Sequence, residues 1–376
     1  MPWHGLAIAA NGNIKPCCQY TSGVERVGGD ITAAFDNDHM RDLRKQFLDG
    51  KRPSGCQSCW QREDQIGISR RMWFTQKFAK YIPDGYQYST EVLEPVWIQA
   101  DINLSNVCNL KCRMCGSWAS NQWFDEEKKL ANLGKRFAKN PNTVPLIQHD
   151  IDDLASMLPY LSRMRRIDFK GGEPMLAKNH TQFLDYLIEH GFNSRITLQY
   201  TTNGTVINPG ILHRLSKFEN VRIMFSIEGT GNLYQYIRGG VHTLEEVTEN
   251  ILQYDDLPNV LIGFNVTMQA YNILDLHNIH RFLHSIPLKH GSAQDAFTTI
   301  CNNPSYLSPF VVPYEIRDLA VRNLSSISDF DHLVGELGHA DWNEYDWETF
   351  ILFTKNLDEW RGEKISDHVP EFARWF

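Results

Sequence analysis

The chain has 376 residues, of which 42% are hydrophobic, and it carries a formal net charge of −8. This length predicts two or three domains, or one large domain with an appendage. The negative charge argues against nucleic acid and anionic membranes as partners, and no apolar run approaches the roughly 18 residues that a membrane span needs. The first residues also lack the basic and apolar segments of a secretory signal, so we expect a soluble, cytoplasmic protein.

Residues 1–65 are predicted to form a small N-terminal module. The stretches GLAIAA and IKPCCQY flank Asn11-Gly12-Asn13, which predicts a hairpin, and a helix is predicted over 36–49. Clustered thiols in a reducing compartment bind metal more often than they form disulfides. The module could therefore hold metal through its cysteines, which are Cys17, Cys18, Cys56 and Cys59.

Residues 66–95 are predicted to be a connector that contains the basic, aromatic stretch SRRMWFTQKFAKY. The stretch is typical of an amphipathic helix with a solvated basic face. The alternative is a surface that grips an acidic peptide or a nucleic acid.

From about residue 96 onward, predicted strands alternate with predicted helices. The strands are expected at 96–104, 166–171, 196–204, 221–229 and 260–269, with a possible sixth near 298–303. Helices are expected at 148–163, 183–191 and 243–254, the last with a capping box of Thr243 and Glu246. This alternation of strands and helices predicts an α/β fold with a mainly parallel sheet. Because five or six units are too few for a closed eight-stranded barrel, we expect a partial barrel over 96–312, followed by a helical cap over 313–376.

Each distinctive motif directly follows a predicted strand. The three cysteines Cys108, Cys112 and Cys115 follow the first strand, GGEP (171–174) follows the second, TTNG (201–204) ends the third, and SIEG (226–229) ends the fourth. The carboxyl ends of parallel strands meet at one edge of a sheet. The sequence therefore predicts that these motifs converge on one site.

The spacing Cys-x3-Cys-x2-Cys lets one short loop supply three thiolates to a cubane iron–sulfur cluster. The fourth iron then has no protein ligand, and an open position is where a bound metal does chemistry. A structural zinc would need a fourth Cys or His at short spacing, which the stretch CNLKCRMC lacks.

The stretch CNLKCRMC resembles the signature of the radical S-adenosylmethionine (SAM) family, and the motifs that follow match that family in order over roughly 96–270. The resemblance implies a partial (β/α)6-type barrel and a [4Fe–4S] cluster that is bound by Cys108, Cys112 and Cys115 and chelates SAM. It also implies that the reduced cluster cleaves SAM to a 5′-deoxyadenosyl radical, which takes a hydrogen atom from the substrate. A one-electron donor such as flavodoxin or ferredoxin is the expected partner.

The resemblance also implies roles for individual residues. Glu173 would face the amino group of SAM, Arg238 would pair with its carboxylate, and Glu228 could act as a base on the substrate, so that Arg238 and Glu228 are the expected catalytic residues. Met114 stands where family members usually have an aromatic residue. The alternative to these roles is that the residues form ordinary turns, pack in the core or carry surface charge. The expected cofactor contacts are Met114, Gly171, Gly172, Glu173, Pro174, Thr202, Asn203, Ser226, Arg238, Asn265 and Val266.

The N-terminal cysteines resemble half of a SPASM domain, the smaller form of which is called a twitch domain. The resemblance implies an auxiliary [4Fe–4S] cluster on Cys17, Cys18, Cys56 and Cys59. One of the two adjacent cysteines could be spare, which would leave a ligand-free position for substrate. A zinc knuckle built from the same thiols is the alternative. Cys301 is expected to be a buried core thiol, with a distant cluster ligand as its alternative.

The motifs leave three functions open. The first is a radical SAM enzyme that acts on a small molecule such as a sugar, an aminocyclitol or a nucleoside. The alternative is a radical SAM maturase that modifies a peptide or protein. The second alternative is a non-enzymatic iron–sulfur electron-transfer protein, against which GGEP and Arg238 argue.

Overall fold

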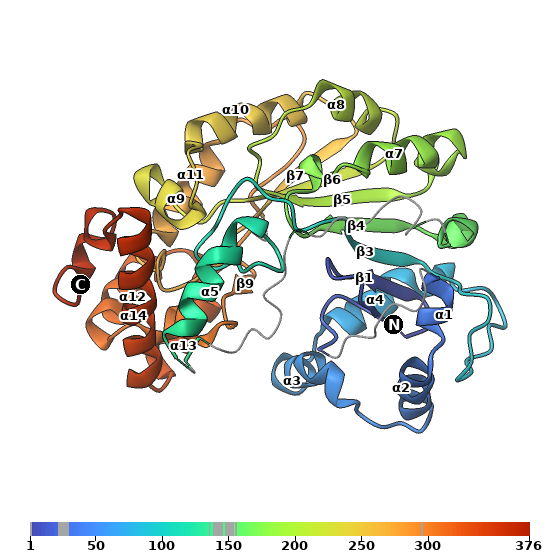
Figure 1. Ribbon diagram of the computed structural model, residues 1–376, viewed down its shortest axis with the longest axis horizontal. Coiled ribbons are helices and arrows are strands. Elements are labelled where there is room, and N and C mark those ends of the chain that lie inside the picture. The colour runs from blue at the N-terminus through green and yellow to red at the C-terminus, as the bar shows by residue number, and fades with distance from the viewer. Residues whose placement is uncertain are drawn as a thin grey trace. The chain divides into compact units, whose positions relative to one another are not determined.

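The computed structural model describes residues 2–21, 30–134, 136–137, 146, 154, 156–294 and 296–376. The protein is a mixed α/β structure, as the sequence predicts (Figure 1). Its main sheet has seven strands in the order β2-β1-β3-β4-β5-β6-β7, and β8 and β9 pair in a second sheet. The strands are β1 (Gly5–Ile8), β2 (Ile14–Lys15), β3 (Gln99–Asn103), β4 (Arg166–Lys170), β5 (Thr197–Thr202), β6 (Val221–Ser226), β7 (Val260–Asn265), β8 (Thr267–Met268) and β9 (Thr299–Ile300).

The strands β3 and β4 are buried along almost their whole length, as expected of strands covered on both faces. They pair in parallel with Ala100 opposite Ile167, and β4 pairs in parallel with β5 with Ile167 opposite Leu198. The predicted α/β class with a parallel sheet is therefore confirmed.

Two features of the strand order differ from the prediction. The predicted N-terminal hairpin forms, but β1 also pairs in parallel with β3, with Leu6 opposite Ala100, so the hairpin is part of the main sheet. The possible sixth strand near 298–303 is the two-residue β9, which pairs with β8 instead of joining the main sheet. Next to β7, in the described part of the chain, an isolated parallel bridge joins Ile262 to Gly291.

The helices predicted at 36–49, 183–191 and 243–254 are present. The helix predicted at 243–254 is α10, and Thr243 and Glu246 form its capping box. In the stretch 148–163, where a helix is predicted, residues 148–153 and 155 lie outside the described residues, and Leu158–Arg163 forms a 3-10 helix. The other helices are α1 (Ile31–Phe35), α2 (Asp38–Leu48), α3 (Gln57–Ile66), α4 (Arg70–Phe78), α5 (Phe124–Asn132), α7 (His180–Glu189), α8 (Pro209–Leu215), α9 (Gly231–Arg238), α10 (Leu244–Asp255), α11 (Leu276–Ser285), α12 (Tyr314–Leu324), α13 (Asp331–His339) and α14 (Glu344–Arg361).

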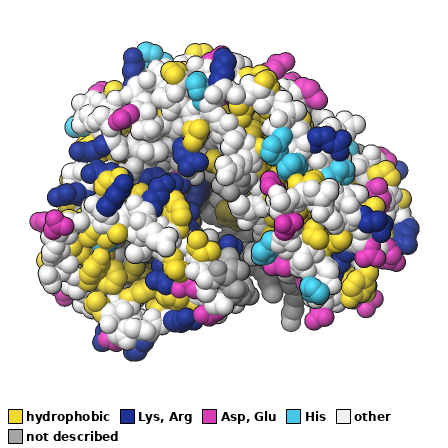
Figure 2. Space-filling model, turned by 180° about the vertical axis from the view of Figure 1, so that it is seen from behind, with side chains coloured by type: hydrophobic (Ala, Val, Ile, Leu, Met, Phe, Trp, Pro, Cys, Tyr) yellow, Lys and Arg dark blue, Asp and Glu magenta, His cyan; other side chains and the backbone are white. Residues whose placement is uncertain are grey.

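The basic, aromatic stretch after residue 69 forms α4, an amphipathic helix. Phe74 and Phe78 are buried against Ile98, while Arg71 pairs with Glu63. This helix therefore packs through its apolar face, as its pattern predicts. On the face of the molecule in Figure 2, acidic and basic side chains are both present, in keeping with the formal net charge of −8.

The chain divides into two compact units. Unit 1 consists of Met1–Val107, Leu146–Tyr200 and His213–Val221, and unit 2 of Cys108–Pro145, Thr201–Leu212 and Arg222–Phe376. The N-terminal cysteines and GGEP belong to unit 1, whereas Cys108, Cys112, Cys115 and Arg238 belong to unit 2. Boundaries at 1–65, 66–95, 96–312 and 313–376 stay predictions. Among the helices in the described part of the chain, none has the length and apolar character to cross a bilayer.

Candidate functional site

The loop from Cys108 to Cys115 opens unit 2. Cys108 and Cys112 are buried, and Cys115 is half-buried. Leu110 is buried with them, and the side chain of Met114 packs against the same group. A backbone hydrogen bond of 2.9 Å from Cys115 to the Cys112 carbonyl turns the loop. The three predicted cluster thiols therefore lie within one short, tightly packed loop.

The thiols of this loop are electrostatically coupled. A hydrogen bond from Cys115 and the charge of the Arg238 guanidinium both hold the pKa of the Cys112 thiol below its usual value. The same hydrogen bond, together with burial, raises the pKa of Cys115. Because metal ligands must be thiolates, the positive charge of Arg238 favours the form that binds iron.

Asn203 directly contacts the first cysteine of the loop. Its amide Nδ2 donates to the Cys108 Sγ at 3.8 Å and to the Asn109 Oδ1 at 2.9 Å. Thr202 is buried beside it, and its hydroxyl accepts a hydrogen bond from the Gly204 amide at 3.1 Å. The TTNG turn therefore lies against the thiol loop, as its place after β5 predicts, and it supplies a donor to a prospective cluster sulfur.

Arg238 and Glu228 form a buried ion pair. The Arg238 Nη1 donates to the Glu228 Oε2 at 2.7 Å, and both side chains are almost fully covered. Burial raises the pKa of Glu228, and the Arg238 charge opposes that rise. The Arg238 Nε is buried and, among the described residues, has no hydrogen-bond partner. A buried donor of this kind fits an anionic ligand such as a carboxylate.

The GGEP motif in unit 1 forms a tight turn after β4. Gly171 and Gly172 have positive φ angles of 75° and 57°, and a Cβ at Gly172 would lie against the Val107 carbonyl oxygen. The Glu173 amide donates to that same oxygen at 2.7 Å, while the buried Glu173 carboxylate accepts from the Met175 amide at 3.1 Å. The turn is thus bonded to the residue that immediately precedes Cys108. Pro174 follows in a 3-10 turn.

The other predicted cofactor contacts lie at strand ends or in the loop. Ser226 ends β6 and Asn265 ends β7, and both are half-buried. The Asn265 carbonyl accepts from the Ile227 amide at 3.2 Å, which joins these two strand ends. Val266 is wholly buried, so any ligand contact would need neighbouring atoms to move aside. The roles of these residues stay predictions.

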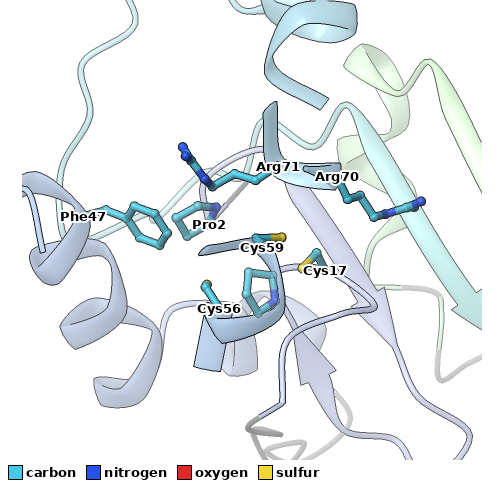
Figure 3. A pocket seen from close by; sticks show the side chains of 8 residues that line it. Pro2, Cys17, Phe47, Cys56, Cys59, Arg70 and Arg71 are labelled. Atoms are coloured by element: carbon cyan, nitrogen blue, oxygen red, sulfur yellow. The ribbon is translucent and has the colours of Figure 1, made fainter. Parts of the chain in front are cut away.

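Three of the four N-terminal thiols line one small pocket in unit 1 (Figure 3). Cys17, Cys56 and Cys59 face it. Burial raises the pKa of Cys17 to about 12 and that of Cys56 to about 11. Cys18 does not line the pocket; it is exposed, and its Sγ lies 3.8 Å from the Lys170 Nζ. The structure therefore separates the two adjacent cysteines. The pocket is completed by Pro2, Pro16, Phe47, Arg70 and Arg71.

Sequence reasoning missed two groups of charged residues beside the thiols. In unit 1, the Lys170 Nζ pairs with the Asp101 Oδ1 at 2.6 Å, and Arg70 approaches the same carboxylate at 3.3 Å. In unit 2, Arg113 is wholly buried within the thiol loop. The sequence gives little signal for either group. Asp101 is an acid inside a predicted strand and Arg113 is a basic residue between two cysteines, and neither pattern identifies a partner.

The donor chemistry of both thiol sets fits iron–sulfur clusters. In the described residues, no three side chains of Cys, His, Asp or Glu are arranged around a single metal ion. A cubane binds each thiolate through a different iron, so its ligands need not converge on one point. Three soft thiols in one loop, with the partnerless Arg238 Nε in the same unit, suit a cluster and an anionic cofactor.

Comparisons with known proteins agree with this chemistry. Residues 102–283 match the family model described as the Radical SAM superfamily. The mycofactocin maturase MftC of Mycobacterium ulcerans is 27% identical over 137 residues, which are 36% of this chain and 31% of that protein. The Fe-coproporphyrin III synthase of Methanosarcina barkeri is 25% identical over 181 residues, 48% of this chain and 39% of that protein. This chain thus matches less than half of the length of either relative.

Among solved structures, Streptococcus suis SuiB bound to the precursor peptide SuiA is similar with a TM-score of 0.37 and 14% identity, over 72% of this chain and 57% of that one. The family match at 102–283 spans the three loop cysteines, GGEP and Arg238. Residues 102–283 are therefore a radical SAM domain.

Proposed function

We propose that this radical SAM enzyme is a maturase that modifies a peptide or protein. The relative with the higher identity is named a maturase. Neither curated relative described above is named for a sugar, an aminocyclitol or a nucleoside. We therefore place the peptide substrate, which was the alternative at the sequence level, ahead of those small molecules. The Fe-coproporphyrin III synthase favours a porphyrin-like small molecule as the second candidate.

The observation that carries the radical chemistry is the buried thiol loop with its neighbouring donor. Cys108, Cys112 and Cys115 would hold the [4Fe–4S] cluster, and the Arg238 Nε is the donor available to the carboxylate of SAM. When bound, the cluster and SAM supply a radical that abstracts hydrogen from the substrate. A flavodoxin or ferredoxin would supply the electron.

The chain's own residues would position and tune this site. Asn203 donates to the Cys108 sulfur, and the Arg238 charge lowers the pKa of Cys112. Glu228 is bonded to Arg238, which supports a role as an orienting partner of that guanidinium, with the substrate base as its alternative. Burial of both side chains excludes water from the pair and strengthens it.

We further propose that the N-terminal pocket holds an auxiliary cluster on Cys17, Cys56 and Cys59. The raised pKa values of Cys17 and Cys56 mean that cluster binding must displace protons from these thiols. Cys18, beside Lys170, would not be a ligand. The fourth iron of such a cluster would then be open to a substrate group, near Arg70 at the pocket wall.

The radical assignment is tested by reductive cleavage of SAM. The anaerobically reconstituted protein with dithionite should release 5′-deoxyadenosine, measured by chromatography. The variant Cys112→Ala should abolish this release, whereas Cys301→Ala, which removes a buried thiol elsewhere in unit 2, should retain it. Cleavage by Cys112→Ala at the wild-type rate would refute the assignment.

The substrate class is tested by deuterium transfer. A lysate of the source organism grown in deuterated medium is separated into a peptide fraction and a fraction of small metabolites. We expect deuterium in 5′-deoxyadenosine from the peptide fraction, and we expect the transfer to disappear after protease digestion. Transfer from the metabolite fraction, unaffected by protease, would replace the maturase proposal with the small-molecule candidate.

A further inference from the structure

The middle cysteine of the thiol loop is flanked by two basic residues that are both held by buried carboxylates. Lys111 precedes Cys112 and Arg113 follows it. The Arg113 side chain is wholly buried, although it projects from a loop that the family motif defines only by its cysteines. A buried guanidinium is costly unless it is paired, so the partners of Arg113 show which residues the loop depends on.

The partners of Arg113 come from the C-terminal part of unit 2. Its Nη2 donates to the Asp358 Oδ1 at 2.6 Å and to the Glu363 Oε2 at 2.5 Å. Its guanidinium also lies over the Tyr236 ring, 3.6 Å from the ring centroid, and the Tyr236 hydroxyl donates to the same Asp358 Oδ1 at 2.8 Å. The second oxygen of Asp358 accepts from the Ile365 amide at 2.8 Å. Asp358 is therefore saturated with donors and fixed in place.

Lys111 is tied to the same C-terminal segment through Glu126. The Lys111 Nζ donates to the Glu126 Oε1 at 2.9 Å, and the Arg361 Nη2 donates to the Glu126 Oε2 at 2.5 Å. Arg361 is the last residue of α14, and its side chain is only 2% exposed. One carboxylate on α5 thus bridges the loop and the end of α14.

The backbone of Cys112 itself is held from the same side. The Trp123 Nε1 donates to the Cys112 carbonyl at 2.8 Å. The Trp123 ring stacks on Phe353 of α14 with centroids 6.2 Å apart and an interplanar angle of 8°, and the Arg361 guanidinium lies 5.1 Å from the Trp123 ring. Residues 353–363 are called the anchor segment from here on. The segment bonds directly to Arg113 and is linked to Cys112 through Trp123 and to Lys111 through Glu126.

We propose that the anchor segment is a positioning device for Cys112, which sets how firmly the [4Fe–4S] cluster is held and the electronic environment of the iron bound there. The proposal rests on membership of the radical SAM superfamily and not on the nature of the substrate. Outer partners that orient metal ligands commonly change metal affinity when they are altered. Here the partner lies 245 residues from Arg113 in sequence, so no local motif contains it.

The test substitutes Asp358→Asn, which keeps the size of the side chain and removes the charge that Arg113 needs. In the anaerobically reconstituted protein, iron release to a chelator should be about tenfold faster than in the wild type. The electron paramagnetic resonance spectrum of the reduced cluster, recorded on protein with its full iron content, should change in shape. Arg113→Lys should reproduce both effects, because lysine lacks the Nε that donates to the Tyr236 carbonyl at 3.0 Å and the planar group that lies over the Tyr236 ring.

The matched control is Arg317→Lys. Arg317 is also buried in unit 2, but among the described residues its hydrogen bonds go to the carbonyls of Phe310, Val312 and Ala340, and none goes to the thiol loop. Its variant should lose thermal stability and yet retain the wild-type spectrum and iron release. If Asp358→Asn does not fold, Glu363→Gln at the more exposed end of the network replaces it, with a smaller effect of the same kind. If the folded variants of Asp358, Glu363 and Arg113 kept the wild-type spectrum and released iron at the wild-type rate, the proposal would be overturned.

Discussion

Arg238 is a single side chain that is fixed by one partner and still has a donor to offer. Its Nη1 is held by Glu228, whereas its Nε has no partner among the described residues. Pairing removes much of the cost of burying the guanidinium. The remaining donor is then oriented before any ligand arrives, which reduces the entropy lost on binding.

The role of Glu228 can be tested with Glu228→Gln. The amide retains the shape of the side chain but cannot neutralise Arg238, so the guanidinium should lose its fixed orientation. We expect the dissociation constant for SAM to rise about tenfold, equivalent to about 1.4 kcal/mol. Equilibrium dialysis with the reconstituted protein measures this. If Glu228 were the substrate base, SAM affinity would be unchanged and only hydrogen abstraction from substrate would fall. Glu246→Gln, in the exposed capping box of α10, is the control.

His180 gives a pH-dependent stability. It is wholly buried beside the Tyr200 hydroxyl, and burial lowers its pKa to about 3 from a usual value of 6.5. Below pH 6.5 the unfolded chain binds a proton that the folded chain resists, so stability falls as the pH drops toward 3. Between pH 6.5 and pH 5 the loss should be about 2 kcal/mol.

Urea unfolding of His180→Gln over the same pH range checks this expectation. Glutamine can still hydrogen-bond to Tyr200 but does not titrate. The part of the stability loss at acid pH that His180 causes should therefore disappear. His190→Gln, at the exposed end of the same helix, should keep the wild-type pH dependence. An unchanged acid loss in His180→Gln would contradict the assignment.

At the scale of elements, the GGEP turn depends on two separate constraints on Gly172. Its φ of 57° lies in the left-handed region, and a Cβ would also meet the Val107 carbonyl oxygen. In Gly172→Ala both constraints are violated, so the hydrogen bond from Glu173 to Val107 should be displaced. We expect SAM affinity to fall at least tenfold and the free energy of unfolding to fall by more than the roughly 1–2 kcal/mol of backbone strain.

Gly191→Ala separates these two constraints. Gly191 has a φ of 69°, and no atom lies within 4 Å of a Cβ placed there. This variant should lose only the roughly 1–2 kcal/mol of backbone strain and should bind SAM normally. Unfolding in urea and equilibrium dialysis compare the two variants. Equal losses in both would mean that the close approach to Val107 has no role.

The elements that the sequence predicts are those with a local signal. The periodicity of 243–254 and its capping residues define α10, and the alternation in 196–204 defines β5. The pairing of β1 with β3 joins residues more than 90 positions apart, and no short-range pattern encodes that partner. The same holds for β9, whose two residues pair with β8, about 30 positions earlier in the chain.

The features of the site also differ in whether a local sequence signal predicts them. Cysteine spacing and the motifs after strands predicted the thiol loop and its convergence with the TTNG turn, but not the hydrogen bond from Asn203 to the Cys108 sulfur. The separation of Cys17 from Cys18 was left open by the sequence, since it depends on Lys170 and Asp101 in distant strands. The pairing of Arg113 with Asp358 was not predicted, because a buried ion pair has no sequence signature when its members lie 245 residues apart.

At the scale of the whole molecule, each compact unit contains its own set of thiols. Cys17, Cys56 and Cys59 lie in unit 1, and Cys108, Cys112 and Cys115 lie in unit 2. A cubane needs its thiolates from one neighbourhood, so the two sets should take up iron separately. Loss of one cluster should then leave the other bound.

Iron analysis of four reconstituted proteins tests this independence. The wild type should contain about eight irons per chain, and both the double variant Cys56→Ala/Cys59→Ala and the single variant Cys112→Ala should contain about four. The double variant should still release 5′-deoxyadenosine from SAM, because the loop of unit 2 is intact, whereas Cys112→Ala should not. Cys301→Ala, which removes a buried thiol from neither set, should keep about eight irons. A wild type with about four irons and one zinc would show that the pocket in unit 1 is a zinc site, and loss of all iron in the double variant would show that the two sets depend on each other.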